Sequence, residues 1–340
     1  MGLCRFLSPS YLTRKSTVQR SCSFQNLKKP PWKVLFFGTD DFSIFSLESL
    51  TKQYRKGTLI NRLEVVTTVK GKPNSVNVFS KQNNLKLHKW PPNITYGQFD
   101  VGLVVSFGHL IPRTVIEKFE FGMLNVHASL LPRWRGAAPI IYAIANGDTQ
   151  TGITIMKISP EKFDVGEIVH QECVQIHADM KMKQLYTTLG KIGAENLVKT
   201  LESLPSSLSQ AKPQPSTGVT YAPKISPQLS HIKWEKMTSQ EIYNLARALD
   251  GIFHVQTTWS GTLVKLINIE KAENDINENE NSQPGRVHYD KQNKILRILC
   301  CDNQFITVEK VGVVGKKIMT SVDFNNGYIK QEPPDCRCFK

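Results

Sequence analysis

Short apolar runs along the chain alternate with stretches in which apolar residues recur every three or four positions. The first pattern is typical of buried strands and the second of helices. The expected strands are 34–37, 63–69, 85–87, 101–105 and 122–127. The expected helices are 76–82, 111–119 and 183–204. Because strands and helices alternate, the sequence predicts an α/β fold with a doubly wound, mostly parallel sheet.

The strand expected at 122–127 carries two polar residues, Asn125 and His127, in an apolar setting. Residues two apart in a strand point to the same face, so the amide and the imidazole would emerge side by side. Open α/β sheets bind their ligands at the carboxyl ends of such strands. The pair alone is explained better by a hydrogen-bonded corner, because buried polar groups normally find partners.

A carboxylate further along the chain shifts this balance towards catalysis. Segment 151–158 alternates like a strand, and Asp164 follows in a turn-like segment before a further strand candidate. This position allows Asp164 to fold back over Asn125 and His127. An amide, an imidazole and a carboxylate together can orient a carbonyl group and relay protons.

The composition changes after the long helix. Segment 205–227 is rich in Ser, Pro, Gln and Gly, which is typical of a linker. A helix is expected beyond it at 239–249, and short strands are expected at 255–259, 262–269, 295–300 and 305–310. Strands in series predict a small β-barrel, with a solvated loop at 271–283. The expected division is a basic arm at 1–31, a catalytic domain at 32–204, a linker at 205–227, a barrel domain at 228–332 and a tail at 333–340.

Length and charge restrict the function classes. A chain of 340 residues exceeds the usual size of one domain, so two domains are expected. No apolar run approaches the length needed to cross a bilayer. The formal net charge of +14 points to a polyanionic partner, because clustered Lys and Arg attract phosphate backbones. A basic targeting segment would account for part of that charge.

The first 31 residues contain Arg, Lys and Ser but neither Asp nor Glu. This composition predicts an organelle transit peptide, and the alternative is a basic arm that binds nucleic acid. The seven cysteines are scattered, so reduced thiols are expected, with Cys300 as a small buried hydrophobe. Cys336 and Cys338 lack the further ligands that zinc requires, and no metal is expected.

Three motifs together resemble one family. Asn125-Val126-His127, the motif SLLPRWRGAAP at 129–139 and Asp164-Val165-Gly166 are similar to the folate-dependent formyltransferases, especially the branch that acts on methionyl-tRNA in mitochondria. The resemblance extends from about Lys33 to Tyr328. It implies a Rossmann-like formyltransferase domain followed by an OB-like barrel, and a location in the mitochondrial matrix.

The resemblance also implies the reaction. The donor would be 10-formyltetrahydrofolate and the acceptor the α-amine of initiator methionyl-tRNA. Asn125 would donate a hydrogen bond to the formyl oxygen, His127 would polarise it or pass a proton to the departing folate nitrogen, and Asp164 would hold His127. The expected folate-binding loop is Ser129, Leu130, Leu131 and Pro132.

The tRNA contacts are inferred from basic residues in the matching segments. The candidates are Lys70, Lys72, Arg133, Arg135, Lys212, Lys224, Lys316 and Lys317. Arg135 has an equally good alternative role, which is to brace the loop through carbonyl contacts. The segment 69–74 is shorter than the corresponding loop of bacterial relatives. The protein is expected to be a monomer that binds tRNA and folate but no membrane.

Two other function classes stay open from the sequence. Another formyltransferase that acts on a small amine, such as a glycinamide nucleotide or an amino sugar, would share Asn125, His127 and Asp164. The strong basic balance favours tRNA over such a substrate. A non-enzymatic RNA-binding protein with an inert α/β half is the third possibility. A formylation assay with charged initiator tRNA separates them.

Overall fold

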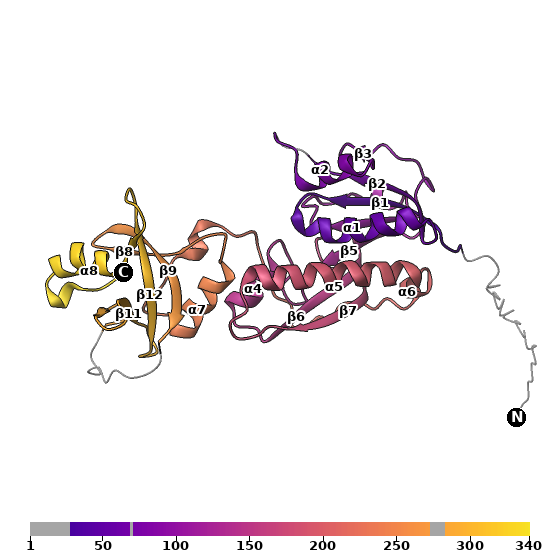
Figure 1. The fold of residues 1–340 in the computed structure, drawn as a ribbon. Coiled ribbons are helices and arrows are strands. Elements are labelled where there is room, and N and C mark those ends of the chain that lie inside the picture. The colour runs from indigo at the N-terminus through magenta and orange to yellow at the C-terminus, as the bar shows by residue number, and fades with distance from the viewer. Residues whose placement is uncertain (1–27, 69–70, 273–282) are drawn as a thin grey trace, which may run out of the picture.

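The computed structural model describes residues 28–68, 71–272 and 283–340, and it contains two sheets with their helices (Figure 1). Nearly all of the basic arm expected at 1–31 lies outside the described residues. Most of the solvated loop expected at 271–283 also lies outside them. The transit peptide therefore stays a prediction.

The first sheet has seven strands in the order β3-β2-β1-β4-β5-β6-β7. They are β1 (Trp32–Gly38), β2 (Ile60–Val66), β3 (Lys86–His88), β4 (Val101–Val105), β5 (Met123–His127), β6 (Gln150–Lys157) and β7 (Ile168–Gln175). The five strands from β3 to β5 in this order are parallel, whereas β6 and β7 pair antiparallel. The predicted doubly wound, mostly parallel sheet is confirmed.

Helices cover this sheet. They are α1 (Asp41–Lys56), α2 (Ser75–Gln82), α3 (Arg113–Ile116), α4 (Pro139–Ala145) and α5 (Met182–Glu202). Helices α1 and α5 lie side by side, and a side chain at Gly190 of α5 would meet the Phe45 ring of α1 at 2.4 Å. On the other face of β1, Leu35 and Phe37 pack in a second core with Phe119. Because both faces are covered, the central strands β1 and β4 are apolar throughout most of their length.

Helix α3 is shorter than predicted. The apolar spacing predicted a helix over 111–119, but it ends at Ile116. The chain must turn back within six residues to enter β5 beside β4. It does so at Gly122, whose φ of 65° is left-handed, and the Phe121 N–H donates to the Asp100 carbonyl at 2.9 Å.

Strand β2 also ends before its predicted boundary. The apolar run 63–69 continues past Val66, where the strand stops. The Asn74 side-chain amide donates to Thr67 Oγ1 at 3.0 Å and to the Thr68 carbonyl at 2.8 Å. Asn74 is also the N-cap of α2, so these bonds turn the chain out of the sheet and into the helix.

The second sheet is antiparallel, with the strand order β10-β11-β12-β9-β8 and β13 paired to β12. Its strands are β8 (Val255–Trp259), β9 (Thr262–Lys271), β10 (Val287–Asp290), β11 (Ile295–Leu299), β12 (Phe305–Val313) and β13 (Met319–Thr320). Its helices are α7 (Ser239–Ala248), α8 (Ser321–Gly327) and the 3-10 segments η1 (Pro227–Ser230), η2 (Ile329–Gln331) and η3 (Pro334–Cys336). Strand β10 and helix α8 were not predicted from the sequence.

The last residues of the chain join the two edges of this sheet. Lys340 exchanges two backbone hydrogen bonds with Thr258 of β8, and the Arg337 carbonyl accepts from Val287 of β10 at 3.0 Å. Between them Phe339 is buried against Trp234 and Phe324. The segment 333–340, expected as a separate tail, thus closes the barrel.

The segment expected as a flexible linker is held against the first sheet. It contains the short helix α6 (Ser206–Ser209), and it pairs with Ile168 through Lys212 and with Arg135 through Tyr221. Its Ser- and Pro-rich composition predicted a linker, and backbone hydrogen bonds hold this linker to Ile168 and Arg135 of the first domain.

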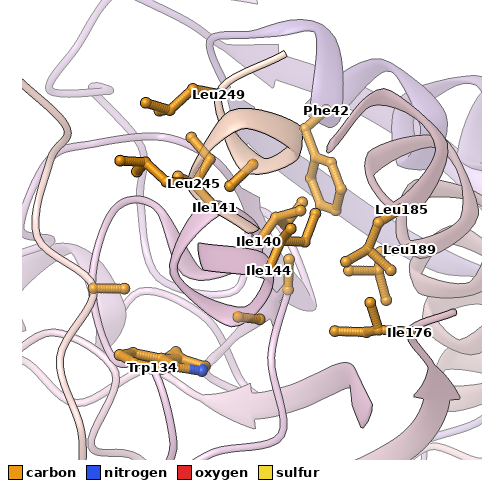
Figure 2. Packing of buried hydrophobic residues seen from close by; sticks show 14 of the residues in the cluster. Phe42, Trp134, Ile140, Ile141, Ile144, Ile176, Leu185, Leu189, Leu245 and Leu249 are labelled. Carbon is orange, nitrogen blue, oxygen red and sulfur yellow. The ribbon is translucent and has the colours of Figure 1, made fainter. Parts of the chain in front are cut away.

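Helix α4 connects the two parts of the molecule. Pro139 occupies its first turn, where the missing N–H has no helical partner to lose. Figure 2 shows its isoleucines between two groups of apolar side chains, Phe42, Leu185 and Leu189 on one side and Leu245 and Leu249 on the other. Tyr243 of α7 also donates to Asp179 at 3.0 Å. The barrel is therefore packed on the first domain.

Candidate active site

Asn125 and His127 lie at the carboxyl end of β5, between β4 and β6. His127 is 6% exposed, whereas Asn125 is half-buried. Among the described residues, the Asn125 side-chain amide has no hydrogen-bond partner in the protein. The simpler explanation of this pair was a hydrogen-bonded corner. Asn125 takes no part in one, and its amide donor is free for a ligand.

The imidazole of His127 is oriented by a loop carbonyl. Its Nε2 lies 2.9 Å from the Trp134 carbonyl oxygen, which only accepts, so Nε2 carries a hydrogen. In the neutral ring Nδ1 is then the acceptor nitrogen. Nδ1 faces Asp164 Oδ1 at 3.7 Å, which is an ion-pair distance but longer than a hydrogen bond.

Asp164 is held in a strained turn between β6 and β7. Its φ of 56° is in the left-handed region, which Asp tolerates better than most residues. Its Oδ2 accepts from the Gly136 N–H at 2.9 Å, and its side chain is 11% exposed. The sequence expectation that Asp164 folds back over His127 agrees with this geometry.

The turn that carries Asp164 needs a close backbone contact. A side chain at Gly166 would lie 1.7 Å from the Lys157 carbonyl oxygen. Gly166 therefore lets the start of β7 come against the end of β6. Lys157 further pairs with Glu167 at 2.8 Å, which ties the same two strand ends together.

A glutamine of the linker joins this turn to the loop 129–139, called the motif loop below. Gln214 donates from Nε2 to the carbonyls of Asp164 and Gly166, both at 2.9 Å. Its Oε1 accepts from Arg135 Nη2 at 2.6 Å and Nε at 3.1 Å. Two roles were left open for Arg135, which are to contact tRNA or to brace the loop. In the structure its guanidinium binds the side-chain carbonyl of Gln214, which agrees with bracing.

Gln214 was missed from the sequence. It lies in a segment of Ser, Pro and Gln whose composition indicates only a linker. The part of the linker that contains Tyr221 and Ala222 also packs on the first domain, through backbone bonds to Arg135. The structure extends that packing to residue 212.

The loop Ser129 to Pro132 uses its polar groups within the protein. Thr154 Oγ1 donates to the Ser129 carbonyl and accepts from the Leu131 N–H, and Gln171 donates to the Leu131 carbonyl. The Pro132 carbonyl accepts from the N–H of Thr220, and Ser129 Oγ donates to the carbonyl of Arg133. These bonds hold the loop in place, and its role in binding folate stays a prediction.

Arg133 is neutralised by an acidic partner. It binds Asp148 through Nε at 2.8 Å and Nη2 at 2.5 Å, and its guanidinium lies 4.4 Å from the Trp134 ring. The hydrogen bond to Asp148 raises the pKa of Arg133 above its ordinary value. Asp148 also accepts from Trp134 Nε1, so this cluster fixes the residue whose carbonyl orients His127.

The loops after β1 and β4 lie next to each other at the carboxyl ends of these parallel strands. The chain order reverses between β1 and β4, where open α/β sheets bind ligands. Thr39 after β1 donates to the Ser106 carbonyl after β4 at 2.6 Å. Ser106 and Gly108 both have left-handed φ, of 48° and 71°. Ser106 and Gly108 were missed from the sequence, because the strand order that brings them next to Thr39 is decided by the tertiary structure.

The lysines expected to contact tRNA are distributed over the surface. Lys70 lies outside the described residues. Lys72, Lys212, Lys224, Lys316 and Lys317 are exposed and belong to no ion pair of the described part of the chain. Lys316 and Lys317 occupy the turn between β12 and β13, which projects from the barrel (Figure 1).

Metal ligands and membrane spans were both expected to be absent. In ranges 28–68, 71–272 and 283–340, no three His, Cys, Asp or Glu side chains gather as metal ligands would. Cys300 is buried, as expected of a small hydrophobe, and burial raises the pKa of its thiol to about 12. No helix in the described part of the protein is both long and apolar enough to span a membrane.

Comparisons with known proteins give consistent matches. The family model described as formyl transferase matches residues 77–201, and that described as formyl transferase, C-terminal domain, matches residues 224–329. The mitochondrial methionyl-tRNA formyltransferase of Bos taurus is 42% identical over 327 residues, covering 91% of this chain and 83% of that protein. The methionyl-tRNA formyltransferase of Fusobacterium nucleatum is 32% identical over 308 residues, covering 87% and 96%.

Solved structures share the fold. WlaRD, a sugar 3N-formyl transferase crystallised with dTDP and 5-N-formyl-THF, has a TM-score of 0.58 at 21% identity, covering 84% of this chain and 99% of that one. An N-formyltransferase from Helicobacter canadensis, in complex with folinic acid and dTDP-3-aminofucose, has a TM-score of 0.61 at 21% identity, covering 82% and 98%. At this identity the likeness concerns the fold alone.

Proposed function

The chain belongs to the formyltransferase family, and from that premise we propose that it transfers a formyl group to the amino group of methionyl-tRNA. Its relatives at 41–42% identity are the mitochondrial methionyl-tRNA formyltransferases of Bos taurus and Homo sapiens. The product is N-formylmethionyl-tRNA for initiation of translation, and the protein acts in the mitochondrion. Initiator tRNA is the specific acceptor that we propose.

The formyl donor is a folate derivative, and we assign it as 10-formyltetrahydrofolate. The amine attacks the formyl carbon, a new carbon–nitrogen bond forms, and the bond to the folate nitrogen breaks. One proton leaves the amine and one reaches the folate nitrogen, so the exchange needs a proton carrier but no metal or oxidant.

Asn125 stabilises the charge that grows on the formyl oxygen. Its amide is half-buried and free of protein partners, which fits a donor that meets its acceptor only in the reacting complex. A preorganised donor of this kind is worth about 10² to 10³ in rate. Its position on β5, fixed by pairing with both neighbouring strands, preorganises it.

His127 and Asp164 carry the proton. Because Nε2 is committed to the Trp134 carbonyl, the free lone pair is on Nδ1, on the side of Asp164. Nδ1 takes the proton from the attacking amine, and the carboxylate 3.7 Å away stabilises the imidazolium formed. The same proton then passes to the departing folate nitrogen.

The tRNA contacts follow from the surface charge. We propose that Lys72, Lys224, Lys316 and Lys317 meet phosphates, since all four are exposed and unpaired in the described part of the chain. Lys70 keeps its proposed role from the sequence. Arg133 and Arg135 are bound to Asp148 and Gln214, so their proposed contribution to tRNA binding is smaller.

The convergence of Asn125, His127 and Asp164 at one edge of the sheet carries the proposal. It is tested by formylation with purified protein and radiolabelled 10-formyltetrahydrofolate. Charged initiator Met-tRNA should accept the label. Glycinamide ribonucleotide and an amino-sugar nucleotide, offered at the same concentration, should not. Label on either small amine and none on tRNA would overturn the proposed substrate.

A further inference from the structure

Two exposed aromatic side chains lie next to the candidate catalytic residues without a structural explanation. Phe163, directly before Asp164, is 56% exposed, and Tyr221, in the linker, is 68% exposed. Single exposed apolar residues are common on proteins. These two differ because both segments are held rigidly at the site.

Tyr221 is presented outward by a buried neighbour. The Ala222 N–H donates to the Arg135 carbonyl at 2.7 Å, and the Arg135 N–H donates to the Thr220 carbonyl at 2.9 Å. Ala222 is fully buried by this pairing. Because successive side chains of an extended segment alternate, Tyr221 must point to solvent.

Gly136 joins the two aromatic segments. Its N–H binds the Asp164 carboxylate at 2.9 Å, and a side chain on it would lie 2.5 Å from the Ala222 carbonyl oxygen. Asp164 and Ala222 thus both contact Gly136, and Phe163 and Tyr221 are the residues directly before them in the chain. Both aromatic residues therefore belong to segments that contact the loop beside Asp164.

The charge around the two rings suits a polyanion. Lys162 precedes Phe163, Lys224 follows Tyr221 by three residues, and both are exposed. The negative charge of Glu161 is offset by Arg113 at 3.6 Å. Exposed aromatic rings beside unpaired cations are the usual means of holding single-stranded nucleic acid, because bases stack on the rings and phosphates meet the cations.

We propose that Phe163 and Tyr221 form a stacking surface for the unpaired nucleotides at the 3′ end of the acceptor tRNA. This inference rests on the proposed function and specifies how the end that bears the amino acid is held. Stacking there aligns the esterified amine with Asn125 and His127 without reading a base sequence. Lys162 and Lys224 contribute charge to the same surface.

The test compares two RNAs in direct binding measurements. One is deacylated tRNA with its intact 3′ end, and the other is the same tRNA trimmed of its unpaired 3′ nucleotides. Wild-type protein should bind the intact RNA more tightly, by about tenfold for one or two stacked bases. In Tyr221→Ala and Phe163→Ala this preference should largely disappear.

Two variants control the measurement. Tyr221→Phe keeps the ring and should keep the preference. Tyr96→Ala removes a tyrosine that is 71% exposed and follows β3 rather than the candidate site, and it should change nothing. An unchanged preference in both alanine variants overturns the stacking surface. So does a raised KM for the folate donor with unaltered tRNA binding, which would assign the rings to folate.

The outcome is separable from the proposed function. The RNA comparison needs no turnover, so it tests the stacking surface by binding alone. If wild-type protein formylates Met-tRNA and the alanine variants keep the preference, only the stacking surface fails. If wild-type protein prefers the intact end but transfers no formyl group to Met-tRNA, the proposed reaction fails and the surface stands.

Gln214 carries a second, independent inference. Its carboxamide bonds both to the Asp164 turn, through two carbonyls, and to Arg135 of the motif loop. The Asp164 carboxylate adds a direct bond to Gly136 of the same loop. We infer that Gln214 is a positioning residue, which sets the distance between the Asp164 carboxylate and His127 from within the linker.

The variants Gln214→Ala and Gln214→Glu test this role. The glutamate can still accept from Arg135 but, when ionised, cannot donate to the two carbonyls. Both variants should lower kcat by about 10- to 100-fold, because a displacement of about 1 Å at a catalytic group has such an effect. The KM values for folate and Met-tRNA should stay within about twofold.

The matched control is Gln228→Ala, an exposed glutamine of η1. It should leave kcat unchanged. A Gln214→Glu protein with normal kcat would overturn the donor role, and a raised KM with normal kcat would assign Gln214 to substrate binding. A thermal unfolding curve like that of the wild type distinguishes mispositioning from loss of the fold.

Discussion

Two polar clusters, one in the barrel and one at the first sheet, are bonded differently. In the barrel, buried Thr257 accepts from Trp234 and donates to the Lys340 carbonyl. In the first sheet, half-buried Asn125 has no partner in the described part of the chain, and His127 and Asp164 stop short of a hydrogen bond. At these two clusters the unpaired donor of Asn125 coincides with the candidate site, while the fully bonded Thr257 holds the end of the chain in the barrel.

The largest effect is expected where the barrel is closed. Phe339→Ala removes a ring that is 1% exposed and contacts Trp234, Trp259 and Phe324. The free energy of unfolding should fall by about 3–5 kcal/mol in a denaturant titration. Phe339→Leu should lose less. A decrease below about 1 kcal/mol for the alanine variant would show that the end of the chain does not hold the barrel.

Asn125→Ala tests the opposite region. The kcat should fall by about 10² to 10³, because the donor that we propose for the formyl oxygen is removed. Stability and tRNA affinity should change little, since the amide has no partner among the described residues. Asn125→Asp keeps the size but lacks the amide donor and should be equally slow. Weakened tRNA binding with normal kcat would contradict the assigned role.

Gly166→Ala sharpens the comparison at the turn that carries Asp164. The new methyl group would overlap the Lys157 carbonyl oxygen at 1.7 Å, so the turn must shift. We expect a decrease of about 1–3 kcal/mol in the free energy of unfolding, together with a lower kcat. Gly327→Ala, where no heavy atom lies within 4 Å, is the control. If the two variants have the same stability and kcat, the close contact between Gly166 and the Lys157 carbonyl does not matter.

The smallest effect is expected at the barrel surface. Replacing Lys316 and Lys317 by Gln should weaken tRNA binding and lower the slope of log K against log salt by up to about 0.9 for each phosphate that is no longer neutralised. The kcat should not change. Lys291→Gln with Lys294→Gln removes the same charge from the exposed turn between β10 and β11. If the two double variants lower the salt slope equally, tRNA binding depends on net charge and not on the position of Lys316 and Lys317.

Local patterns explain which features could be predicted. The strand with Asn125 and His127 follows from alternation over five residues, and α5 and α7 follow from their apolar spacing. Helix α4 was missed because its seven residues are apolar almost throughout and give no periodic signal. The strained φ of Asp164 could not be predicted either, because contacts from Gly136 and Gln214 impose it.

The sequence by itself determined the two sheets, the strand that carries Asn125 and His127 and the net positive charge, since these depend on local periodicity and composition. Only the tertiary structure decided that the linker is part of the site. The hydrogen bond between Gln214 and Asp164 spans 50 residues of chain, and Lys340 meets Thr258 across 82 residues. Such interactions arise from packing between distant segments, which no local pattern encodes.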